Sequence, residues 1–220
     1  SGFSGSVRGV AVDKSGHIYA LNVGRDFSGN GVINSPSLGR RALTDWSSGE
    51  IISTERSPFG NTRFFVGRDG VKHIFLADSS SRAVIDAQPD PFPLANGDGA
   101  TFKVYCSGTQ SRAMIGPHDL ALGRKGRLYV TGQRWADNTV VGDGDLWTCS
   151  PTSGKARRLG LFGRIGGVEL SPDDSTLYVS ENFNVDDVPS SSKILKIPIH
   201  PSTGAALVGN ATTFVDIGDL

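Results

Sequence analysis

The sequence predicts an all-β fold, a β-propeller built from four-stranded antiparallel blades. Three observations predict it: a strand–hairpin–strand segment that recurs four times, a nearly constant spacing between the copies, and no sustained apolar pattern at i, i+3 and i+4. The 29 glycines and 11 prolines are spread through all 220 residues, which leaves little room for helices. An apolar fraction of 37% is enough to support a buried core.

Each copy of the repeat is a pair of short apolar runs around a turn built on Gly or Asp, which is typical of a β-hairpin. The copies are residues 8–22, 62–78, 117–131 and 166–182. The aromatic residue of the second run measures their spacing: Tyr19 to Phe75 is 56 residues, Phe75 to Tyr129 is 54, and Tyr129 to Tyr178 is 49. This period is typical of propeller blades.

Two further strands are expected in each repeat. They are residues 41–46 with 50–53, 83–86 with 101–105, 145–148 with 156–159, and 193–197 with 213–216. Blades are therefore expected at about residues 5–57, 58–110, 111–163 and 164–220 of a single domain spanning residues 1–220. A β-sandwich is the alternative, but four matching units favour the propeller, whose blades pack face on face and leave only short edges.

Four whole blades fit into the chain, and this number raises the question of ring closure. Either the four blades close into a compact ring, or they form part of a larger ring whose other blades are cleaved or supplied by another chain. An open propeller would expose two apolar blade faces, which soluble monomers avoid. We favour the incomplete ring, and we expect a protein partner, or self-assembly, through the exposed blade faces.

Net charge, the length of the apolar runs and the first residues restrict the possible partners and the location. Lys+Arg and Asp+Glu are equal at 22 each, so no net field favours nucleic acid or an anionic membrane surface. No apolar run approaches the roughly 18 residues needed to cross a bilayer. The chain starts without a Met or a signal-peptide core, which suggests that it is processed or excerpted.

Two features bear on secretion. Cys106 and Cys149 form either one disulfide of a secreted protein or two buried thiols. Asn210, in Asn210-Ala211-Thr212, begins a glycosylation sequon, which favours the secretory route. We expect an extracellular protein with a glycosylation site at Asn210.

Three runs of the third blade carry a family resemblance. They are residues 116–122 (Gly-Pro-His-Asp-Leu-Ala-Leu), 126–135 (Gly-Arg-Leu-Tyr-Val-Thr-Gly-Gln-Arg-Trp) and 142–147 (Gly-Asp-Gly-Asp-Leu-Trp). They resemble secreted microbial members of the gluconolactonase / senescence-marker-protein (regucalcin-like) family. Residues 166–182 resemble the next blade of that family, which normally has an Asn-Gly turn before a Ser-Pro-Asp-Gly hairpin. The resemblance covers nearly the whole chain, is weaker in the first two blades, and implies a six-bladed propeller with about two blades absent here.

The resemblance implies a metal site at the top of the central channel. Members of the family hydrolyse sugar lactones with one divalent cation, which oxygen ligands hold so that it polarises the lactone carbonyl and activates water. The family's first-blade Glu ligand falls on Arg8, its Asn ligand on Gly166, and an Asn that contacts metal-bound water or substrate on His118. A further Asp ligand belongs to a blade that this chain lacks. Because Arg8 would repel a cation and Gly166 has no side chain, a hard-cation site of the family type is not expected to form.

His118 and Asp119 are the candidate catalytic residues of a rebuilt site, and Arg8 and His118 are expected at the channel mouth. His118 is either a base or a ligand for a softer metal, or a hydrogen-bonded channel histidine. Asp119 has a simpler interpretation as the cap of a backbone turn. Asp143 and Asp145, with Asp137, have acidic side chains that suit calcium, but a solvated turn is favoured because the spacing is not that of an EF-hand.

The changed ligand positions favour a non-catalytic extracellular propeller that serves binding or structural assembly. The alternative is a divalent-metal-dependent sugar-lactone hydrolase with a site rebuilt from His118, Asp119 and groups of the missing blades. No cofactor is predicted for the first hypothesis, whereas the second requires Ca²⁺ or another divalent cation. Fold alone does not decide between them, because propellers host both classes.

Overall fold

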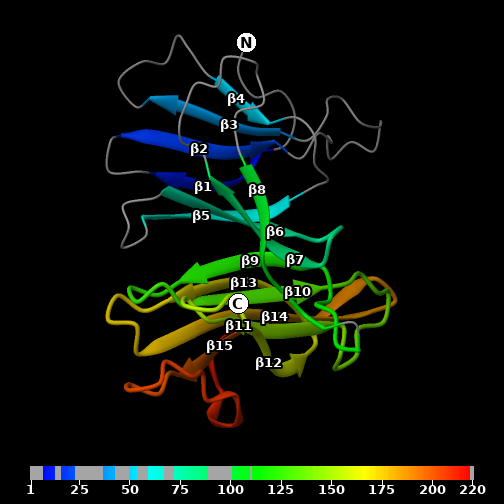
Figure 1. Cartoon of the computed structure of the whole chain (residues 1–220). Coiled ribbons are helices and arrows are strands. Elements are labelled where there is room, and N and C mark those ends of the chain that lie inside the picture. The colour runs from blue at the N-terminus through cyan, green and yellow to red at the C-terminus, as the bar shows by residue number, and fades with distance from the viewer. Residues whose placement is uncertain are drawn as a thin grey trace. The chain divides into compact units, whose positions relative to one another are not determined.

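The computed structural model describes residues 7–12, 16–22, 37–42, 50–53, 59–66, 72–88, 101–109 and 111–218 (Figure 1). The chain divides into two compact units, residues 1–105 and 106–220, and each is considered by itself. No helix in the described part of the chain has the length and apolar character needed to cross a membrane.

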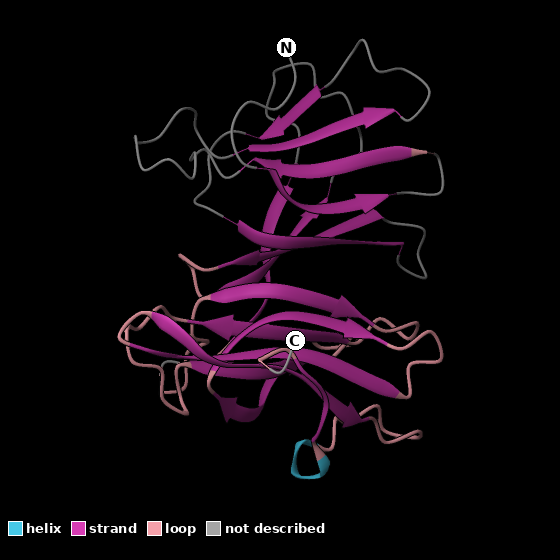
Figure 2. Cartoon of the chain, turned by 180° about the vertical axis from the view of Figure 1, so that it is seen from behind, coloured by secondary structure: helices cyan, strands magenta, loops and turns pink. Residues whose placement is uncertain are grey.

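The described residues form four sheets of four strands, which confirms the predicted all-β class. The first two sheets are β1 (Val7–Val12), β2 (His17–Asn22), β3 (Ser37–Ala42) and β4 (Glu50–Ser53), then β5 (Phe59–Val66), β6 (Lys72–Asp78), β7 (Ala83–Gln88) and β8 (Thr101–Ser107). The other two are β9 (Pro117–Leu122), β10 (Leu128–Gln133), β11 (Gly144–Cys149) and β12 (Ala156–Phe162), then β13 (Arg164–Leu170), β14 (Thr176–Val185), β15 (Val188–Pro198) and β16 (Thr212–Asp216). The described residues hold one short helix, η1 (Val208–Asn210) (Figure 2).

Each sheet is a meander in which consecutive strands are neighbours. The hairpins predicted from the repeat are those of β1–β2, β5–β6, β9–β10 and β13–β14. One predicted boundary is wrong: β3 covers residues 37–42 instead of 41–46. The reason is that β3 pairs along the whole of β2, from Asn22 opposite Ser37 to His17 opposite Ala42, so backbone pairing and not the local apolar run sets its start.

The turns of three of these hairpins use the left-handed backbone region. Gly16 and Gly126 have φ values of 78° and 79°, and Asp174 takes the same conformation at 60°. Glycine adopts this region without steric cost, and Asp is among the few other residues that tolerate it in turns. The Asp-rich turn of the fourth copy is therefore equivalent to the glycine turns of the first and third copies.

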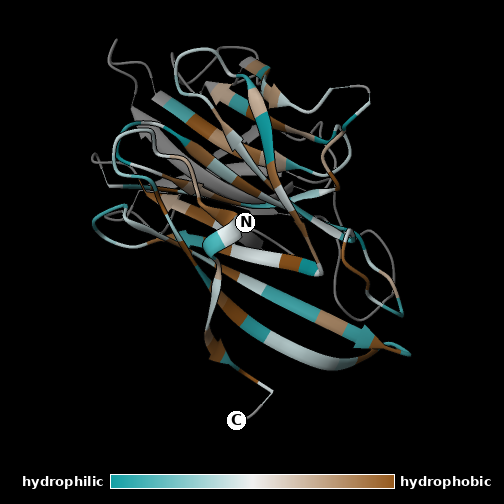
Figure 3. Cartoon of the chain, turned by 90° about the horizontal axis from the view of Figure 1, so that it is seen from below, coloured by the Kyte–Doolittle hydropathy of each residue, from teal (hydrophilic) through white to brown (hydrophobic). Residues whose placement is uncertain are grey.

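Apolar side chains gather between neighbouring sheets in each unit. In the first unit, Tyr19 of β2 packs with Ile74 and Leu76 of β6. In the second unit, β13 lies against β9 and β10, and one core combines Leu146 of β11 with Val179 of β14. Hydrophilic and hydrophobic bands alternate along the strands (Figure 3), as expected when one face of a strand is buried and the other is not.

The two cysteines form a disulfide, which resolves the two alternatives that the sequence left open. It joins Cys106, near the end of β8, to Cys149, the last residue of β11, with 6.2 Å between the two Cα atoms. Both residues are almost completely buried. The bond closes a loop with a sequence separation of 43 residues.

We predict that replacing both cysteines by serine lowers the free energy of unfolding by about 4 kcal/mol, the chain-entropy value for a loop of this length. Urea denaturation of the oxidised wild type and of Cys106→Ser/Cys149→Ser measures the difference. Reductant should destabilise the wild type and leave the double variant unchanged. Equal midpoints for the oxidised and reduced wild type would contradict a stabilising disulfide.

Candidate functional site

A β-bulge interrupts the first strand of each sheet close to its start. The extra residues are Gly9 in β1, Gly60 and Asn61 in β5, His118 in β9, and Gly166 and Gly167 in β13. A bulge bends its strand and turns a side chain away from the regular alternation. The positions that the resemblance singles out, Arg8, His118 and Gly166, therefore lie at or beside the same local distortion of the backbone.

His118 and Gly166 lie close together at the edge of the second unit where β9 and β13 begin. A Cβ atom at Gly166 would lie 4.0 Å from His118 Nδ1, 4.0 Å from Gln133 Oε1 and 3.5 Å from Ser180 Oγ. Thr131 Oγ1 donates a hydrogen bond to the Gly166 carbonyl oxygen at 2.5 Å. The space above Gly166 is thus bordered by polar groups, and His118 itself is half-buried.

Asp119 lies beside His118, and both of its carboxylate oxygens accept backbone hydrogen bonds. The Leu120 amide donates to Oδ1 at 2.7 Å, and the Val168 amide of β13 donates to Oδ2 at 2.9 Å. Asp119 is only 9% exposed. Its carboxylate therefore ties β9 to the start of β13, which agrees with the capping role that the sequence allowed.

Arg8 belongs to β1 of the other unit, and its side chain lies outside the part of the chain that the structure describes. Asn61 is a residue that the sequence analysis did not select. Its backbone forms part of the β5 bulge, at the place where β13 has Gly166 and Gly167. The apolar pattern of the second copy begins at Thr62, directly after the bulge, so it gives no signal for Asn61.

Two acidic residues near the start of β11, Asp143 and Asp145, are buried, whereas the sequence favoured a solvated turn. Asp143 and Asp145 are 1% and 0% exposed. Burial alone would raise the pKa of Asp143, but hydrogen bonds from the Val140 amide and the Arg134 side chain lower it overall. These bonds, at 2.8 Å and 2.5 Å, fold the loop around the Asp143 carboxylate.

Asp145 is a second internal anchor of this segment. Its Oδ2 accepts hydrogen bonds from Trp147 Nε1 at 2.5 Å and from the Ile115 amide at 3.1 Å. Burial raises the pKa of Asp145, and these hydrogen bonds oppose the rise. A Cβ atom at Gly132 would lie 2.3 Å from Asp145 Oδ1, so only glycine fits above this carboxylate. Both acids therefore organise the loop, and the described residues contain no group of three or more His, Cys, Asp or Glu side chains arranged to hold a metal ion.

The exposed side chain of Trp135 stacks with Arg164 at the same edge as His118. The guanidinium carbon of Arg164, the first residue of β13, lies 4.0 Å from the centre of the indole ring. Arg164 Nε and Nη1 are buried and take no hydrogen-bond partner among the described residues. Such a cation–π pair presents a rigid aromatic surface with a positive charge beneath it. In the sequence, Trp135 stands out only as the last residue of the run 126–135. No local pattern pairs it with Arg164.

Hydrogen bonds join the β10–β11 loop to the β14–β15 hairpin. The Thr139 amide donates to the Asn184 carbonyl at 3.0 Å, and the Asn184 amide donates to Thr139 Oγ1 at 3.1 Å. The Asp187 amide donates to the Asp137 carbonyl at 2.9 Å. We call the two joined segments, residues 134–143 and 184–188, the rim.

Apolar side chains of the rim point into solvent. Trp135, Val140, Val141, Val185 and Val188 are each between 55% and 67% exposed. Exposed apolar side chains that gather on one surface can mark a contact site. Asn210 is also exposed, at the end of η1, so the predicted glycosylation sequon lies on the surface.

Comparison with solved structures places these features in a known fold. A gluconolactonase from Xanthomonas campestris superposes with a TM-score of 0.68 at 16% identity, over 96% of this chain and 63% of its own. The calcium-binding protein regucalcin from Agrobacterium tumefaciens has a TM-score of 0.65 at 15% identity, over 96% of this chain and 59% of its own. The PQQ-bound form of an aldose sugar dehydrogenase from Streptomyces coelicolor has a TM-score of 0.57 at 12% identity, over 99% of this chain and 69% of its own.

These matches confirm the predicted β-propeller fold and the structural resemblance to gluconolactonases and regucalcin. No family model and no curated protein sequence matches the chain. The chain spans about three fifths of the length of the gluconolactonase and of regucalcin. Since identities this low establish the fold alone, the activity must be argued from the residues.

We predict that Asp119→Ala lowers the free energy of unfolding by about 2 to 4 kcal/mol, because it leaves the amides of Leu120 and Val168 without acceptors. Asp119→Asn keeps one carbonyl oxygen and should lose about half as much. Urea denaturation measures both changes. Asp137→Ala, which removes an exposed carboxylate on the same edge, is the matched control, and an equal loss in it and in Asp119→Ala would contradict the anchoring role.

Proposed function

We propose that the chain is a non-catalytic extracellular β-propeller that serves binding or structural assembly. The observation that carries this proposal is the setting of Asp119, which is only 9% exposed and whose two carboxylate oxygens each accept a hydrogen bond from a backbone amide. General-base catalysis or metal binding needs a carboxylate with an accessible lone pair directed at water, substrate or the cation. The neighbouring β13 bulge contributes Gly166 and Gly167, which have no side chains to replace it.

The rim supports the binding role. Trp135 and the four exposed valines are held on two segments that are hydrogen-bonded to each other, so a partner could contact them without first ordering a loop. Acidic residues Asp137, Asp186 and Asp187 lie among them and are exposed. The chemistry of the rim thus suits a protein surface with apolar and basic side chains.

Sheet faces supply a second kind of contact surface. In β1, Ala11 faces the core of its unit, while Val10 and Val12 are 55% and 52% exposed. In the fourth sheet, Tyr178 and Phe214 make an edge-to-face contact with ring centres 5.1 Å apart, and the Phe214 residue is exposed. Exposed apolar positions on sheet faces suit contact with further blades, from a second copy or from a partner protein. The buried disulfide supports an extracellular setting, where such bonds form and persist.

The alternative function is a divalent-metal-dependent sugar-lactone hydrolase with a rebuilt site. One observation favours it: His118, Gln133 and Ser180 direct polar atoms toward the space above Gly166. Gluconolactonase activity belongs to one of the proteins that this chain resembles in fold. In this alternative, His118 would act with groups from other blades, and Ca²⁺ or another divalent cation would be required.

We predict that the purified chain hydrolyses a sugar lactone no faster than buffer does, with or without Ca²⁺. Because the proposal gives neither His118 nor a cation a catalytic role, chelator and the His118→Ala substitution should both leave the rate unchanged. A pH-stat assay measures the acid released. Turnover that disappears with chelator and falls by about tenfold or more in His118→Ala would establish the hydrolase instead.

We also predict that the chain self-associates in a concentration-dependent manner through the exposed face of β1. The double substitution Val10→Ser/Val12→Ser should abolish the larger species, because it removes the apolar area that a second sheet would cover. Sedimentation velocity over a range of concentrations measures the distribution. Val104→Ser, at an exposed valine of β8 in the same unit, is the matched control. A wild type that stays monomeric throughout would contradict self-assembly.

A further inference from the structure

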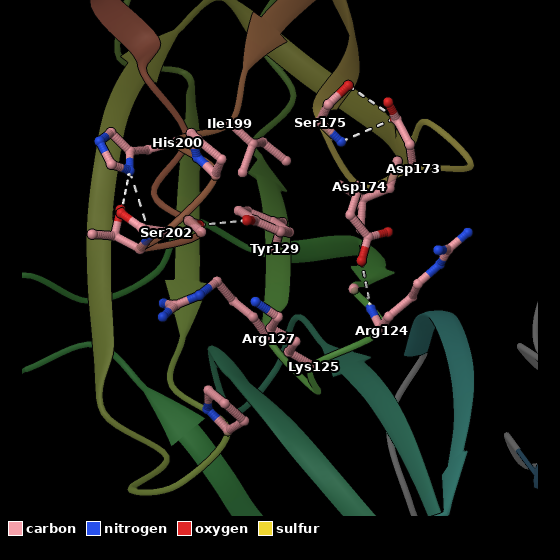
Figure 4. A pocket seen from close by; sticks show the side chains of 16 residues that line it. Arg124, Lys125, Arg127, Tyr129, Asp173, Asp174, Ser175, Ile199, His200 and Ser202 are labelled. Atoms are coloured by element: carbon pink, nitrogen blue, oxygen red, sulfur yellow. Dashed lines mark hydrogen bonds between the residues drawn. The ribbon is translucent and has the colours of Figure 1, made fainter.

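A pocket of about 480 Å³ lies at the end of the second unit opposite His118 (Figure 4). The β9–β10 hairpin, the β13–β14 hairpin and the loop between β15 and β16 meet there. Nothing in the proposed binding role uses this end of the sheets. Its volume lies within the range of pockets that bind small organic molecules.

The β9–β10 hairpin brings cationic side chains to the pocket. Arg124, Lys125 and Arg127 all line it. Among the described residues, neither the Arg127 guanidinium nor the Lys125 ammonium group has a hydrogen-bond or ion-pair partner. Arg127 is half-buried, so its charge is less screened than that of a fully exposed arginine.

Arg127 lies close to the backbone of the facing loop. Gly204 has a φ of 63°, and a Cβ atom there would lie 3.0 Å from Arg127 Nε. Tyr129 donates its phenolic hydrogen to the Gly204 carbonyl at 2.6 Å, and the Gly204 amide donates to the His200 carbonyl at 2.8 Å. The loop is therefore closed by internal hydrogen bonds, and Arg127 lies along it without being neutralised.

Burial raises the pKa of Tyr129 to about 12, while the nearby charge of Arg127 acts in the opposite direction and that of Asp174 adds to the rise. Tyr129 is therefore neutral at physiological pH and remains a hydrogen-bond donor. Together with Ile199 and Leu170, it gives the pocket an apolar wall. A purely inorganic ion would leave this wall without a partner.

Two carboxylates line the β13–β14 side of the pocket, and both are already engaged. Asp173 Oδ1 accepts hydrogen bonds from Ser171 Oγ at 2.6 Å and from the Ser175 amide at 3.1 Å, which lower the pKa of Asp173 to about 2. Asp174 Oδ2 accepts a hydrogen bond from the Arg124 amide at 2.7 Å. With three cations and two anions, the lining has an excess of one positive charge when His200 is neutral.

We propose that this pocket binds a singly charged organic anion, a carboxylate whose charged group lies at Arg127 and Lys125 and whose body packs on Tyr129 and Ile199. The guanidinium supplies a planar, bidentate donor pair that matches a carboxylate. A multiply charged anion is disfavoured because Asp173 and Asp174 face it across the pocket. The phenol and the aliphatic side chains accept a ring-sized body, which explains why the pocket is apolar between its two charged sides.

The test is a titration of the ¹⁵N-labelled chain, followed by amide chemical shifts, with benzoate as the probe. Benzamide, which has the same ring without the charge, and inorganic phosphate, which has charge without a ring, are the comparison ligands. Benzoate should shift the amides of residues 123–127, 173–175 and 199–204 in a saturable manner, at least about tenfold more tightly than benzamide. Phosphate should bind these residues more weakly than benzoate.

Arg127→Gln should weaken benzoate binding by about tenfold or more while the rest of the amide spectrum stays unchanged. Arg157→Gln, at an exposed arginine of β12 in the same unit and outside the pocket, is the matched control and should bind as the wild type does. Equal binding of benzoate and benzamide, or undiminished binding by Arg127→Gln, would overturn the proposal. Tighter binding of phosphate than of benzoate would overturn the assignment of a single charge.

Discussion

The structure depends on covering the apolar face of each four-stranded sheet with the face of a neighbour. A sheet that is apolar on one face must bury that face against another element to form a stable core. In residues 106–220, the core is shared between two sheets, with Leu146 and Phe162 from one and Leu177, Val179 and Ile197 from the other. By the same requirement, the apolar side chains of Val10 and Val12 on the exposed side of β1 offer an area that a further sheet could cover.

The bulges show how this scaffold keeps its backbone while the chemistry of a position changes. Each first strand is distorted near its start, although the residues there are as different as glycine, asparagine and histidine. In β13, the Ser180 hydroxyl oxygen accepts a hydrogen bond from the Gly167 amide at 2.7 Å, and the Asp119 carboxylate accepts one from the Val168 amide. The distortion is thus stabilised by neighbouring side chains and does not require a ligand-binding residue within it. A glycine pair can therefore occupy the bulge while the strand keeps its pairing with β14.

The two ends of the second unit have different chemical character. At the end where β9 and β13 begin, buried acids and hydrogen-bonded segments support an exposed apolar rim around Trp135. At the other end, hairpins that are close only in space enclose a pocket with a cationic side and an apolar wall. The surface contact and the small-molecule binding that we propose would therefore use opposite ends of the same strands.

Much of the fold was predictable, because the repeat, the hairpin turns and the period of two along each strand are local patterns. The start of β3 was not predictable, because pairing with β2 sets it.

The sequence by itself thus determined the sheets and the chemical groups available on them. Only the tertiary structure decided that Cys106 bonds to Cys149, that Asp119 is engaged by an amide 49 residues away, that Asp143 and Asp145 are buried, and that Arg127 faces a pocket. The physical reason is that these outcomes depend on contacts between residues of different strands, loops and sheets, and such contacts leave no periodic signal in the sequence.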